Sequence, residues 1–326
     1  MTLPQPAWAY NDMVDVSVIT AVWNGEHTII RAAMSALSQS GITVEVIVAD
    51  DASTDATRSV VTGIRDSRVR YLRLPVNGGP AAARNAAIEV AKGAWIAVLD
   101  ADDMFLDDRL ARLVTTASEN CLEIVTDNMI IEDTRGLRRL FIEEDSDGAL
   151  QFRSFADYID CNRLFGRLPN EGYLKPMFAA DFLRRHTLHY DTSTRIGEDF
   201  LLVAEAMALG ARYGRVRAAG YVYTTGSGSI SHRLSRRDAN AMVEADRRYL
   251  SRYAPSLNAT ERAAWRAHLE DLEDGANFVA MVDSIKARDF VSFARCAWRR
   301  PTAVRHFSMP IRARIERLTR CRAVIG

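Results

Sequence analysis

Three aspartates follow an apolar segment in the first third of the chain. The stretch "AWIAVLDADDMF", residues 94–105, has the composition of a buried strand and then places Asp100, Asp102 and Asp103 within four residues. Three carboxylates this close repel one another, and a divalent cation bound among them would relieve that repulsion. Carboxylate oxygens suit Mg²⁺ and Mn²⁺. The alternative is a solvated acidic turn that caps the following helix.

Polar residues also follow other apolar segments. The segment 14–22 continues into "WNGE", the segment 44–50 continues into "DASTD", and "NGGPAAARN" leads into a helix. Strand and helix patterns alternate four times in the first hundred residues, which is typical of a parallel sheet covered by helices. Ligands bind such sheets beyond the carboxyl ends of the strands. We therefore expect the three aspartates to line a ligand crevice.

The hydrophobic pattern predicts the elements that position these residues. Ser53 is a candidate N-cap for the second helix, and Gly93 is expected to end the third. Residues 132–150 are polar and acidic and are predicted to form an exposed loop, and residues 170–178 fall where an acceptor-side loop is expected. The predicted strands are 14–22, 44–50, 69–74, 94–100, 122–131 and a short one from 221, and the predicted helices are 24–41, 53–66, 81–93, 106–119, 155–165, 197–210 and most of 236–295.

Composition narrows the class of protein. The chain has 326 residues, of which 48% are hydrophobic and 26% charged, and its net charge is zero, which gives no reason to expect a nucleic-acid partner. Its four cysteines are far apart, so we expect neither a disulfide framework nor a zinc site. The sequence has no signal-peptide pattern and no membrane-spanning segment. These features favour a cytoplasmic location.

The C-terminal segment has a different charge balance. From Trp298 onward, 29 residues contain eight arginines and one acid, Glu316, and Ile311, Ile315 and Leu318 share one helical face. Such a segment can lie on the anionic inner face of the cytoplasmic membrane. The alternative is a solvated helix that packs on the rest of the protein.

Two common nucleotide-binding motifs are absent. The turn after the first strand reads "TAVWNGEH" and has one glycine, whereas the dinucleotide-binding motif needs GxGxxG there. The chain also lacks the GxxxxGK[ST] loop that binds phosphates in P-loop proteins.

The four strand-end and loop stretches "WNGE", "DASTD", "NGGPAAARN" and "DADD" together resemble motifs of the family 2 inverting glycosyltransferases. The sequences of that family read like V-S-V-I-x-x-x-x-N, V-D-D-x-S-x-D, N-x-G-x-x-x-x-R-N and D-x-D-D in this order. The resemblance spans roughly residues 14–232, and within the family it is greatest to bacterial exopolysaccharide glucosyltransferases of the succinoglycan-assembly type. It implies the α/β GT-A fold, with a mainly parallel sheet flanked by helices. The implied catalytic domain is 1–232, with a nucleotide-binding half at about 14–105 and an acceptor half at about 106–232. A helical extension would follow at 233–326.

The resemblance also implies roles for individual residues. Asp102 or Asp103 would bind Mg²⁺ or Mn²⁺, which stabilises the diphosphate leaving group. Asp51 or Asp50 would read uracil, because a carboxylate accepts the N3–H that cytosine lacks. Residues implied to bind the sugar nucleotide are Ala21, Asn24, Glu26, Asp50, Asp51, Arg84, Asn85, Asp100, Ala101, Asp102 and His232.

The general base is expected at the start of the helix 197–210. In "RIGEDFLL" the resemblance assigns that role to Asp199, with Glu198 as the alternative. A purely structural role for both acids is the competing interpretation, because carboxylates in a first helical turn complement the helix dipole.

The expected activity is therefore a metal-dependent, inverting transfer of a hexose, with glucose favoured, from a UDP-sugar to a hydroxyl of a growing, lipid-linked bacterial polysaccharide. One alternative is a nucleotidyltransferase that makes sugar nucleotides. Another is a non-catalytic protein that binds sugar nucleotides or acts as a scaffold. Whether the chain forms a homodimer stays open at this point.

Overall fold

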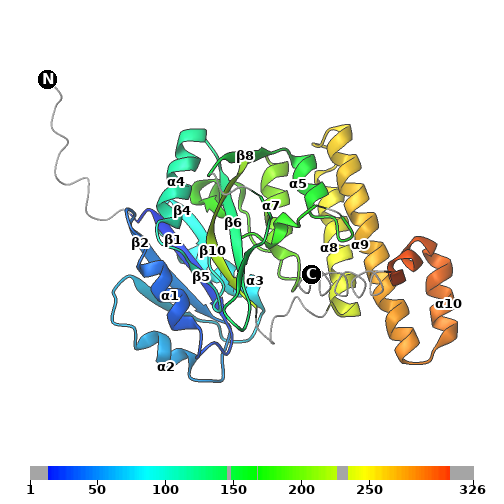
Figure 1. Cartoon of the computed structure of the whole chain (residues 1–326), viewed down its shortest axis with the longest axis horizontal. Helices are drawn as coiled ribbons and strands as arrows, with labels where there is room; N and C mark the ends of the chain where they lie inside the picture. Colours follow the sequence, from blue (N-terminus) through cyan, green and yellow to red (C-terminus); the bar gives the residue numbers. More distant parts are fainter. Residues whose placement is uncertain (1–13, 145–147, 167, 226–233, 309–326) are drawn as a thin grey trace, which may run out of the picture.

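The computed structural model describes residues 14–144, 148–166, 168–225 and 234–308 and contains a ten-stranded mixed sheet with helices on both faces (Figure 1). The main strand order is β3-β2-β1-β4-β9-β6-β10-β5, with β7 paired to β6 and β8 paired to β10. The strands are β1 Val16–Val22, β2 Val44–Asp50, β3 Val69–Arg73, β4 Trp95–Val98, β5 Met104–Phe105, β6 Ile124–Glu132, β7 Arg138–Leu140, β8 Leu150–Arg153, β9 Met177–Ala179 and β10 Tyr213–Thr224. The helices of the sheet region are α1 Ile29–Leu37, α2 Thr57–Thr62, α3 Pro80–Val90, α4 Arg109–Asn120, α5 Phe155–Cys161, α6 Ala180–His186 and α7 Glu198–Ala208.

The first four strands have the predicted parallel arrangement. β1 pairs in parallel with β2 and β4, and β2 pairs in parallel with β3. Side chains alternate between the two faces of β1, so that Val16 and Val18 pack against α1, α2 and α4 while Ile19 packs against α3 and α7. Because these strands are parallel, their carboxyl ends share one edge of the sheet, and the polar segments that follow them meet there.

Three expectations about local structure were wrong. Ser53 does not cap the second helix, which begins after Ala56. The third helix ends at Val90, and Gly93 instead lies so close to β1 that a Cβ atom would approach the Ser17 backbone nitrogen to 2.4 Å. The predicted loop 132–150 contains β7 and the first residue of β8. The segment 170–178 contains the 3₁₀ helix Glu171–Tyr173 and the first two residues of β9. Short strands with polar residues carry too little periodic signal to be found from the pattern alone.

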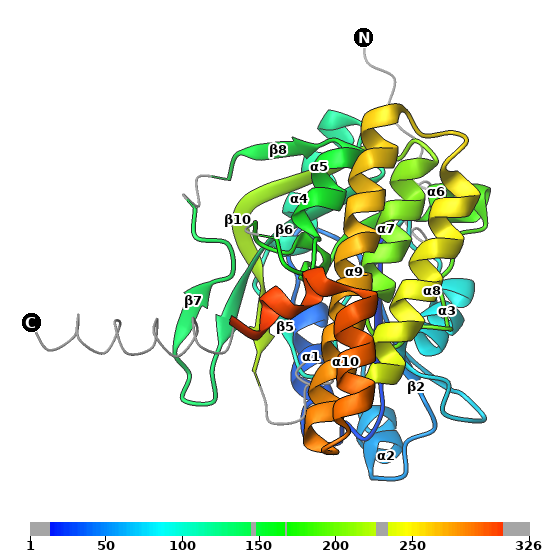
Figure 2. The same ribbon diagram turned by 90° about the vertical axis from the view of Figure 1, so that its right-hand side faces the viewer.

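A helical region follows the sheet, as predicted. It consists of α8 Arg236–Tyr253, α9 Ala259–Lys286, α10 Phe290–Arg299 and the 3₁₀ helix Pro301–Ser308, and Figure 2 shows α8 and α9 beside α7. Trp265 of α9 is fully buried and its ring contacts that of Phe155 in α5, with centroids 5.5 Å apart. The core on the α7 side of the sheet thus continues into α8 and α9. No helix in the described parts of the chain is long and apolar enough to cross a membrane.

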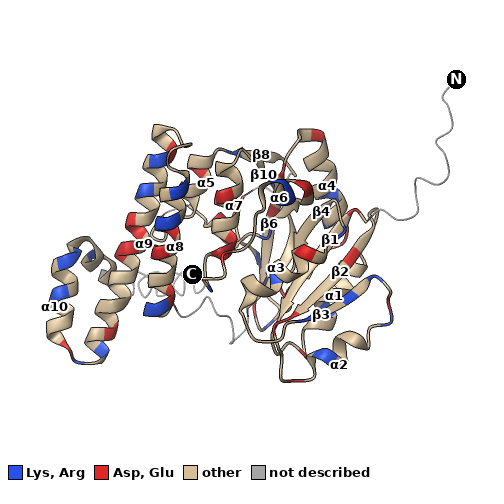
Figure 3. Ribbon diagram, turned by 180° about the vertical axis from the view of Figure 1, so that it is seen from behind, with Lys and Arg blue, Asp and Glu red and all other residues tan. Residues whose placement is uncertain are grey.

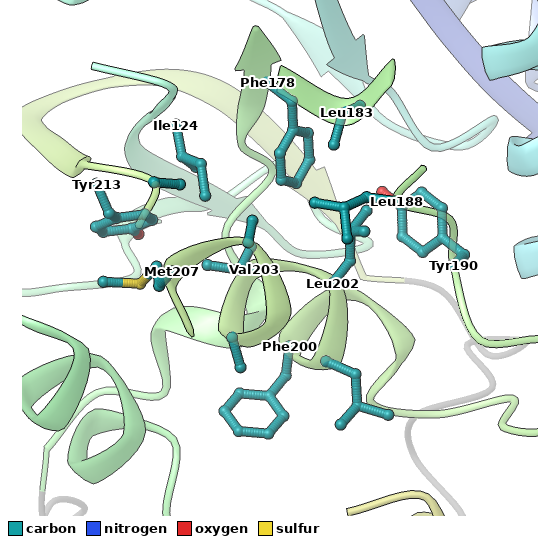
Figure 4. Close-up of a cluster of buried hydrophobic side chains, with 14 of the residues drawn as sticks. Ile124, Phe178, Leu183, Leu188, Tyr190, Phe200, Leu202, Val203, Met207 and Tyr213 are labelled. Atoms are coloured by element: carbon teal, nitrogen blue, oxygen red, sulfur yellow. The ribbon is translucent and has the colours of Figure 1, made fainter. Parts of the chain in front are cut away.

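Helix α7 is central to this core. Figure 4 shows Leu202, Val203 and Met207 of α7 lying among side chains from β6, β9 and the segment after α6. Phe200 points to the other side of the helix in the same view, and its ring lies 5.8 Å from that of Tyr158 and 4.5 Å from that of His268. This packing fixes the start of α7, where the acids Glu198 and Asp199 lie.

A buried acid and a buried histidine lie at the α8–α9 contact. Asp246 and His268 are both almost fully buried and are 3.7 Å apart, and the indole N–H of Trp265 donates to Asp246 Oδ1 at 2.9 Å. Burial raises the pKa of the Asp246 carboxyl to about 7. Burial also lowers the pKa of the His268 imidazole to about 4. Both groups are therefore neutral in mildly acidic solution.

Replacing Asp246 with asparagine is expected to stabilise the protein more at pH 8 than at pH 5. In the folded chain Asp246 keeps its proton up to about pH 7, whereas in the unfolded chain it releases the proton above about pH 4. The free energy of unfolding of the wild type therefore falls as the pH rises from about 4 to 7. The variant lacks that loss, which amounts to about 4 kcal/mol at most. Urea unfolding at both pH values measures the difference, with the exposed Asp283→Asn on α9 as control. A loss of stability in the variant, larger at pH 5 than at pH 8, would instead indicate that Asp246 and His268 form an ionised pair.

Candidate active site

The loops after β1 and β2 are joined by hydrogen bonds. The N–H of Asn24 donates to Ser53 Oγ at 2.8 Å, and Glu26 Oε2 accepts from the N–H of Ala56 at 2.7 Å. Asn24 has a φ of 53°, a left-handed conformation that asparagine adopts more readily than most residues. Ala21 is half-buried near the end of β1. Ala21, Asn24 and Glu26, all predicted to bind the nucleotide, therefore lie at or near two loops that hydrogen bonds join at the carboxyl ends of β1 and β2.

Asp50 has a structural environment. Its carboxylate is fully buried and accepts from the N–H of Ser53 at 2.8 Å, from Arg73 at 2.9 Å and from the hydroxyl of Tyr71. Burial opposes its ionisation, but the hydrogen bonds from Ser53 and Tyr71 and the charge of Arg73 hold the pKa of Asp50 below its usual value. These three partners belong to β3 and to the loop between β2 and α2.

Asp51 points toward the next strand-end loop. Its two carboxylate oxygens accept from the N–H groups of Gly78 and Gly79 at 2.7 and 2.8 Å. Gly79 precedes α3 with a φ of 86°, which a residue with a side chain adopts only with strain. The Asp51 carboxylate thus fixes the loop that leads into α3.

Five charged side chains form a cluster beside these loops. Arg84 of α3 contacts Asp100 at 2.8 Å, Glu198 at 3.0 Å and Asp199 at 3.2 Å. Lys175 contacts Asp100 and Asp199, both at 2.9 Å. Asp199, the predicted base, therefore shares both cations with Asp100, the first aspartate of "DADD", and Glu198 shares Arg84 with them. We call these five residues the ion cluster.

Burial makes the ion cluster electrostatically strong. Burial disfavours the charge on Asp100, but Lys175 and Arg84 outweigh it and hold the pKa of this carboxyl far below its usual value. Asp100 and Asp199 in turn outweigh the burial of Lys175 and raise its pKa. Burial and the neighbouring charge of Asp199 raise the pKa of Glu198. The cluster holds three acids against two bases, so one of its acids has no cation of its own.

Asp103 and Asp102 have opposite environments. Asp103 is fully buried, and its oxygens accept from the Tyr221 hydroxyl at 2.7 Å and from the Thr224 N–H at 2.8 Å. Burial and the charges of Asp100 and Asp102 raise the pKa of Asp103 to about 8. Asp102 is exposed, and its backbone oxygen accepts from Arg31. Of the two predicted metal ligands, only Asp102 has a carboxylate free of hydrogen bonds from other described residues.

The side chains at the end of β4 fit a divalent cation that is bound mostly by the phosphates of the donor. In the described ranges, no group of three or more His, Cys, Asp or Glu side chains is arranged to hold a metal by itself. One exposed carboxylate at Asp102 is compatible with Mg²⁺ or Mn²⁺, which are commonly held by one or two carboxylates together with phosphate oxygens. A hollow of about 560 Å³ lies elsewhere, between α1 and α2, and its lining by Ile30, Met34 and Val60 does not suit a diphosphate.

The family model described as "Glycosyl transferase family 2" matches residues 17–173. The succinoglycan biosynthesis protein ExoO of Rhizobium meliloti (strain 1021) is 39% identical over 310 residues, which cover 95% of this chain and 88% of that protein. This chain belongs to glycosyltransferase family 2. The resemblance expected from the strand-end motifs is thereby confirmed.

Two further comparisons place the family 2 chain among known proteins. The UDP-Glc:alpha-D-GlcNAc-diphosphoundecaprenol beta-1,3-glucosyltransferase WfaP of Escherichia coli is 39% identical over 99 residues, which are 30% of this chain and 39% of that protein. The crystal structure of S. aureus TarS 1–349 in complex with UDP-GlcNAc has a TM-score of 0.59 and 18% identity, and covers 88% of this chain and 92% of that one. The predicted GT-A fold is confirmed by this structural similarity.

Other predicted residues of this glycosyltransferase lie around the cluster. Asn85 exchanges two hydrogen bonds of 2.8 Å with the backbone of Tyr190, and the Tyr190 ring lies under the Arg84 guanidinium at 5.3 Å. Asn85 thus holds the segment that covers Arg84. Ala101 is half-buried in the turn after Asp100. His232 lies outside the described residues.

Lys175 was not among the predicted site residues. This residue lies between the 3₁₀ helix Glu171–Tyr173 and β9, in the segment predicted to be an acceptor-side loop. One signal was available, because the chain has only three lysines, Lys92, Lys175 and Lys286, and otherwise uses arginine for positive charge. A lysine in a chain that otherwise uses arginine is a candidate for a buried ion pair.

Proposed function

We propose that this family 2 glycosyltransferase is an inverting, metal-dependent hexosyltransferase that acts on a UDP-sugar and a lipid-linked bacterial polysaccharide. The observation that carries the proposal is the ion cluster, in which Asp199 shares Arg84 and Lys175 with Asp100 at the strand end of "DADD". One group of side chains therefore links the proposed base to the proposed donor site. The glucosyltransferase activity of WfaP and the role of ExoO in succinoglycan biosynthesis support glucose as the sugar and polysaccharide synthesis as the process.

The reaction is proposed as a single displacement. The acceptor O–H gives its proton to the Asp199 carboxylate as the oxygen attacks the anomeric carbon. The bond from that carbon to the diphosphate oxygen breaks at the same time, and UDP leaves with its electron pair. Attack from the face opposite the leaving group inverts the configuration, and no covalent enzyme intermediate forms. Glu198, with its raised pKa, stays the alternative base.

The donor site is proposed at the carboxyl ends of β1, β2 and β4. A divalent cation held by Asp102 and the donor phosphates would supply positive charge where the leaving group develops negative charge. Both aspartates are buried, but Asp50 accepts from Ser53, Tyr71 and Arg73 while each Asp51 oxygen accepts one backbone N–H and keeps a second lone pair, so Asp51 is the favoured reader of uracil. Arg84 and Lys175 would lie near the diphosphate.

UDP release tests the proposal directly. Purified protein is incubated with Mn²⁺, a lipid-linked acceptor and a panel of UDP-sugars, and the products are identified by mass spectrometry and their anomeric configuration by NMR. We expect one UDP-hexose to be consumed, with an inverted linkage in the product. A protein that binds donors but releases no UDP with any of them would be a binder or scaffold. Retention of configuration would overturn the proposed mechanism.

Asp102→Asn is expected to weaken Mn²⁺ binding in the presence of UDP by at least about 10-fold, because it removes the proposed protein ligand. The exposed Asp107→Asn, in the same strand-end region, is the matched control and should bind Mn²⁺ as wild type does. Isothermal titration calorimetry with UDP and Mn²⁺ measures both affinities. If Asp102→Asn binds Mn²⁺ normally while Asp103→Asn does not, the buried aspartate is the ligand instead.

The proposed location is the cytoplasm, with peripheral contact at the inner face of the cytoplasmic membrane. A lipid-linked acceptor is held at that surface, so an enzyme that works on it benefits from being there. The arginine-rich segment from Trp298 onward supports this proposal, although residues 309–326 lie outside the described ranges.

A further inference from the structure

Helix α10 exposes large apolar side chains. None of its ten residues is buried, and Phe290 and Val291 are each 71% exposed while Trp298 is 90% exposed. These three residues and Ala294 lie on one side of the helix, because the spacings of three, four and seven or eight residues bring side chains to the same face. We call this side the α10 apolar face.

The opposite side of α10 is packed against the protein. The Phe293 ring lies 6.1 Å from that of Phe307 in the final 3₁₀ helix, and the Asn277 side chain donates to the backbone oxygen of Cys296 at 2.9 Å. The helix is therefore held in place with its apolar face turned outward. Figure 1 shows α10 at the end of the molecule away from α1 and α2. Exposed aromatic residues gathered on one helix face mark a contact surface more often than a plain solvated surface.

Positive charge borders this apolar face. Arg295 and Arg299 lie on α10 itself, Lys286 and Arg288 lie just before it, and all four are exposed. Figure 3 shows basic residues on α10. Lys286 Nζ lies 4.0 Å from the exposed Asp283 carboxylate, whereas no ion pair among the described residues includes Arg288 or Arg299. The nearby Asp289 accepts from the N–H of Ser292 at 2.9 Å and so serves as the helix cap.

We propose that the α10 apolar face lies on an anionic phospholipid surface, with Phe290 and Trp298 in the interface and the bordering arginines against lipid phosphates. Aromatic residues beside basic ones favour the boundary between headgroups and acyl chains. This inference rests on the proposed function for the need to reach a lipid-linked acceptor. The inference goes beyond the proposed function because it assigns the membrane contact to the α10 apolar face.

Charge argues against two other occupants of the face. Residues 309–326 contain five arginines and one acid, so packing them on α10 would bring like charges together. A second copy of the chain on the same face would add a second set of the same bordering cations to the contact. An anionic lipid surface is the occupant whose charge complements the bordering arginines.

Vesicle flotation with the full chain tests the proposal. Wild type is expected to bind vesicles rich in phosphatidylglycerol at least ten-fold more tightly than vesicles of phosphatidylcholine alone. The double variant Phe290→Glu/Trp298→Glu should lose at least ten-fold of that affinity, whereas Leu137→Glu, which is 60% exposed on the β6–β7 turn, should keep it. Arg295→Glu/Arg299→Glu leaves the aromatic residues in place and should reduce binding most at low salt.

Three results would overturn the proposal. The first is wild-type vesicle binding by both double variants, which would assign any membrane contact to another segment. The second is an absence of vesicle binding by the wild-type chain. The third is a wild-type dimer that becomes a monomer in Phe290→Glu/Trp298→Glu, measured by analytical ultracentrifugation without lipid. UDP release from the donor in the presence of a soluble acceptor separates this inference from the proposed function. The α10 variants should retain that activity even when they no longer bind vesicles.

Discussion

Replacing Asp199 with asparagine is expected to lower the rate of sugar transfer by about 10²–10⁴-fold, because an amide cannot take the proton of the acceptor hydroxyl. The fold should tolerate this change. Arg84 and Lys175 keep Asp100 and Glu198 as partners, so the ion cluster then contains two acids and two bases. Donor binding, measured by calorimetry with UDP, should stay close to wild type while UDP release falls.

Glu198→Gln is the matched control for Asp199→Asn. Its amide oxygen can still accept from Arg84, so it should cost much less activity if Asp199 is the base. Wild-type turnover by Asp199→Asn together with an inactive Glu198→Gln would move the base to Glu198. Loss of UDP binding in Asp199→Asn would indicate a structural role for this carboxylate.

Replacing Lys175 with methionine is expected to destabilise the protein by about 3–5 kcal/mol, because it leaves buried carboxylates without their cation. The three acids Asp100, Glu198 and Asp199 would then share Arg84 alone. The loss should shrink as the pH falls toward 4. In wild type, Lys175 keeps Asp100 ionised to well below the usual pKa, whereas in the variant a carboxyl can take up a proton and relieve the repulsion.

Urea unfolding between pH 4 and pH 8 measures this effect. Lys175→Arg keeps the charge and should lose less stability than Lys175→Met, although a guanidinium fits the site differently from an ammonium. Lys92→Met serves as a second control, because it removes a lysine that has no part in the ion cluster. A Lys175→Met variant as stable as wild type would contradict the arrangement of the ion cluster.

The strands that carry the site could be predicted because their residues are consecutive and apolar. β1, β2 and β4 each appear as a short apolar run followed by a polar segment, and parallel pairing brings the three ends to one edge. The early residues of α7 were found for a similar reason, since "GED" directly precedes a strong helical pattern. Family motifs then added roles that periodicity alone does not give.

The rest depended on contacts between segments far apart in the chain. Lys175 meets Asp100 only because β9 inserts antiparallel between β4 and β6, a pairing that three residues cannot signal in advance. Asp102 and Asp103 are adjacent in sequence, yet one is exposed and the other is bound by Tyr221 and Thr224 of β10. No local pattern distinguishes them, since the deciding partner lies more than a hundred residues away.

The loops after β1 and β2 border the proposed donor site and are joined by hydrogen bonds, which bears on any attempt to change the donor preference. Asn24 and Glu26 on one loop hold Ser53 and Ala56 on the other, so neither loop keeps its shape alone. Replacing one loop alone with that of a relative that differs at these positions would leave the hydrogen-bond donors and acceptors of the two loops mismatched. A successful chimera has to exchange both loops as a single cassette.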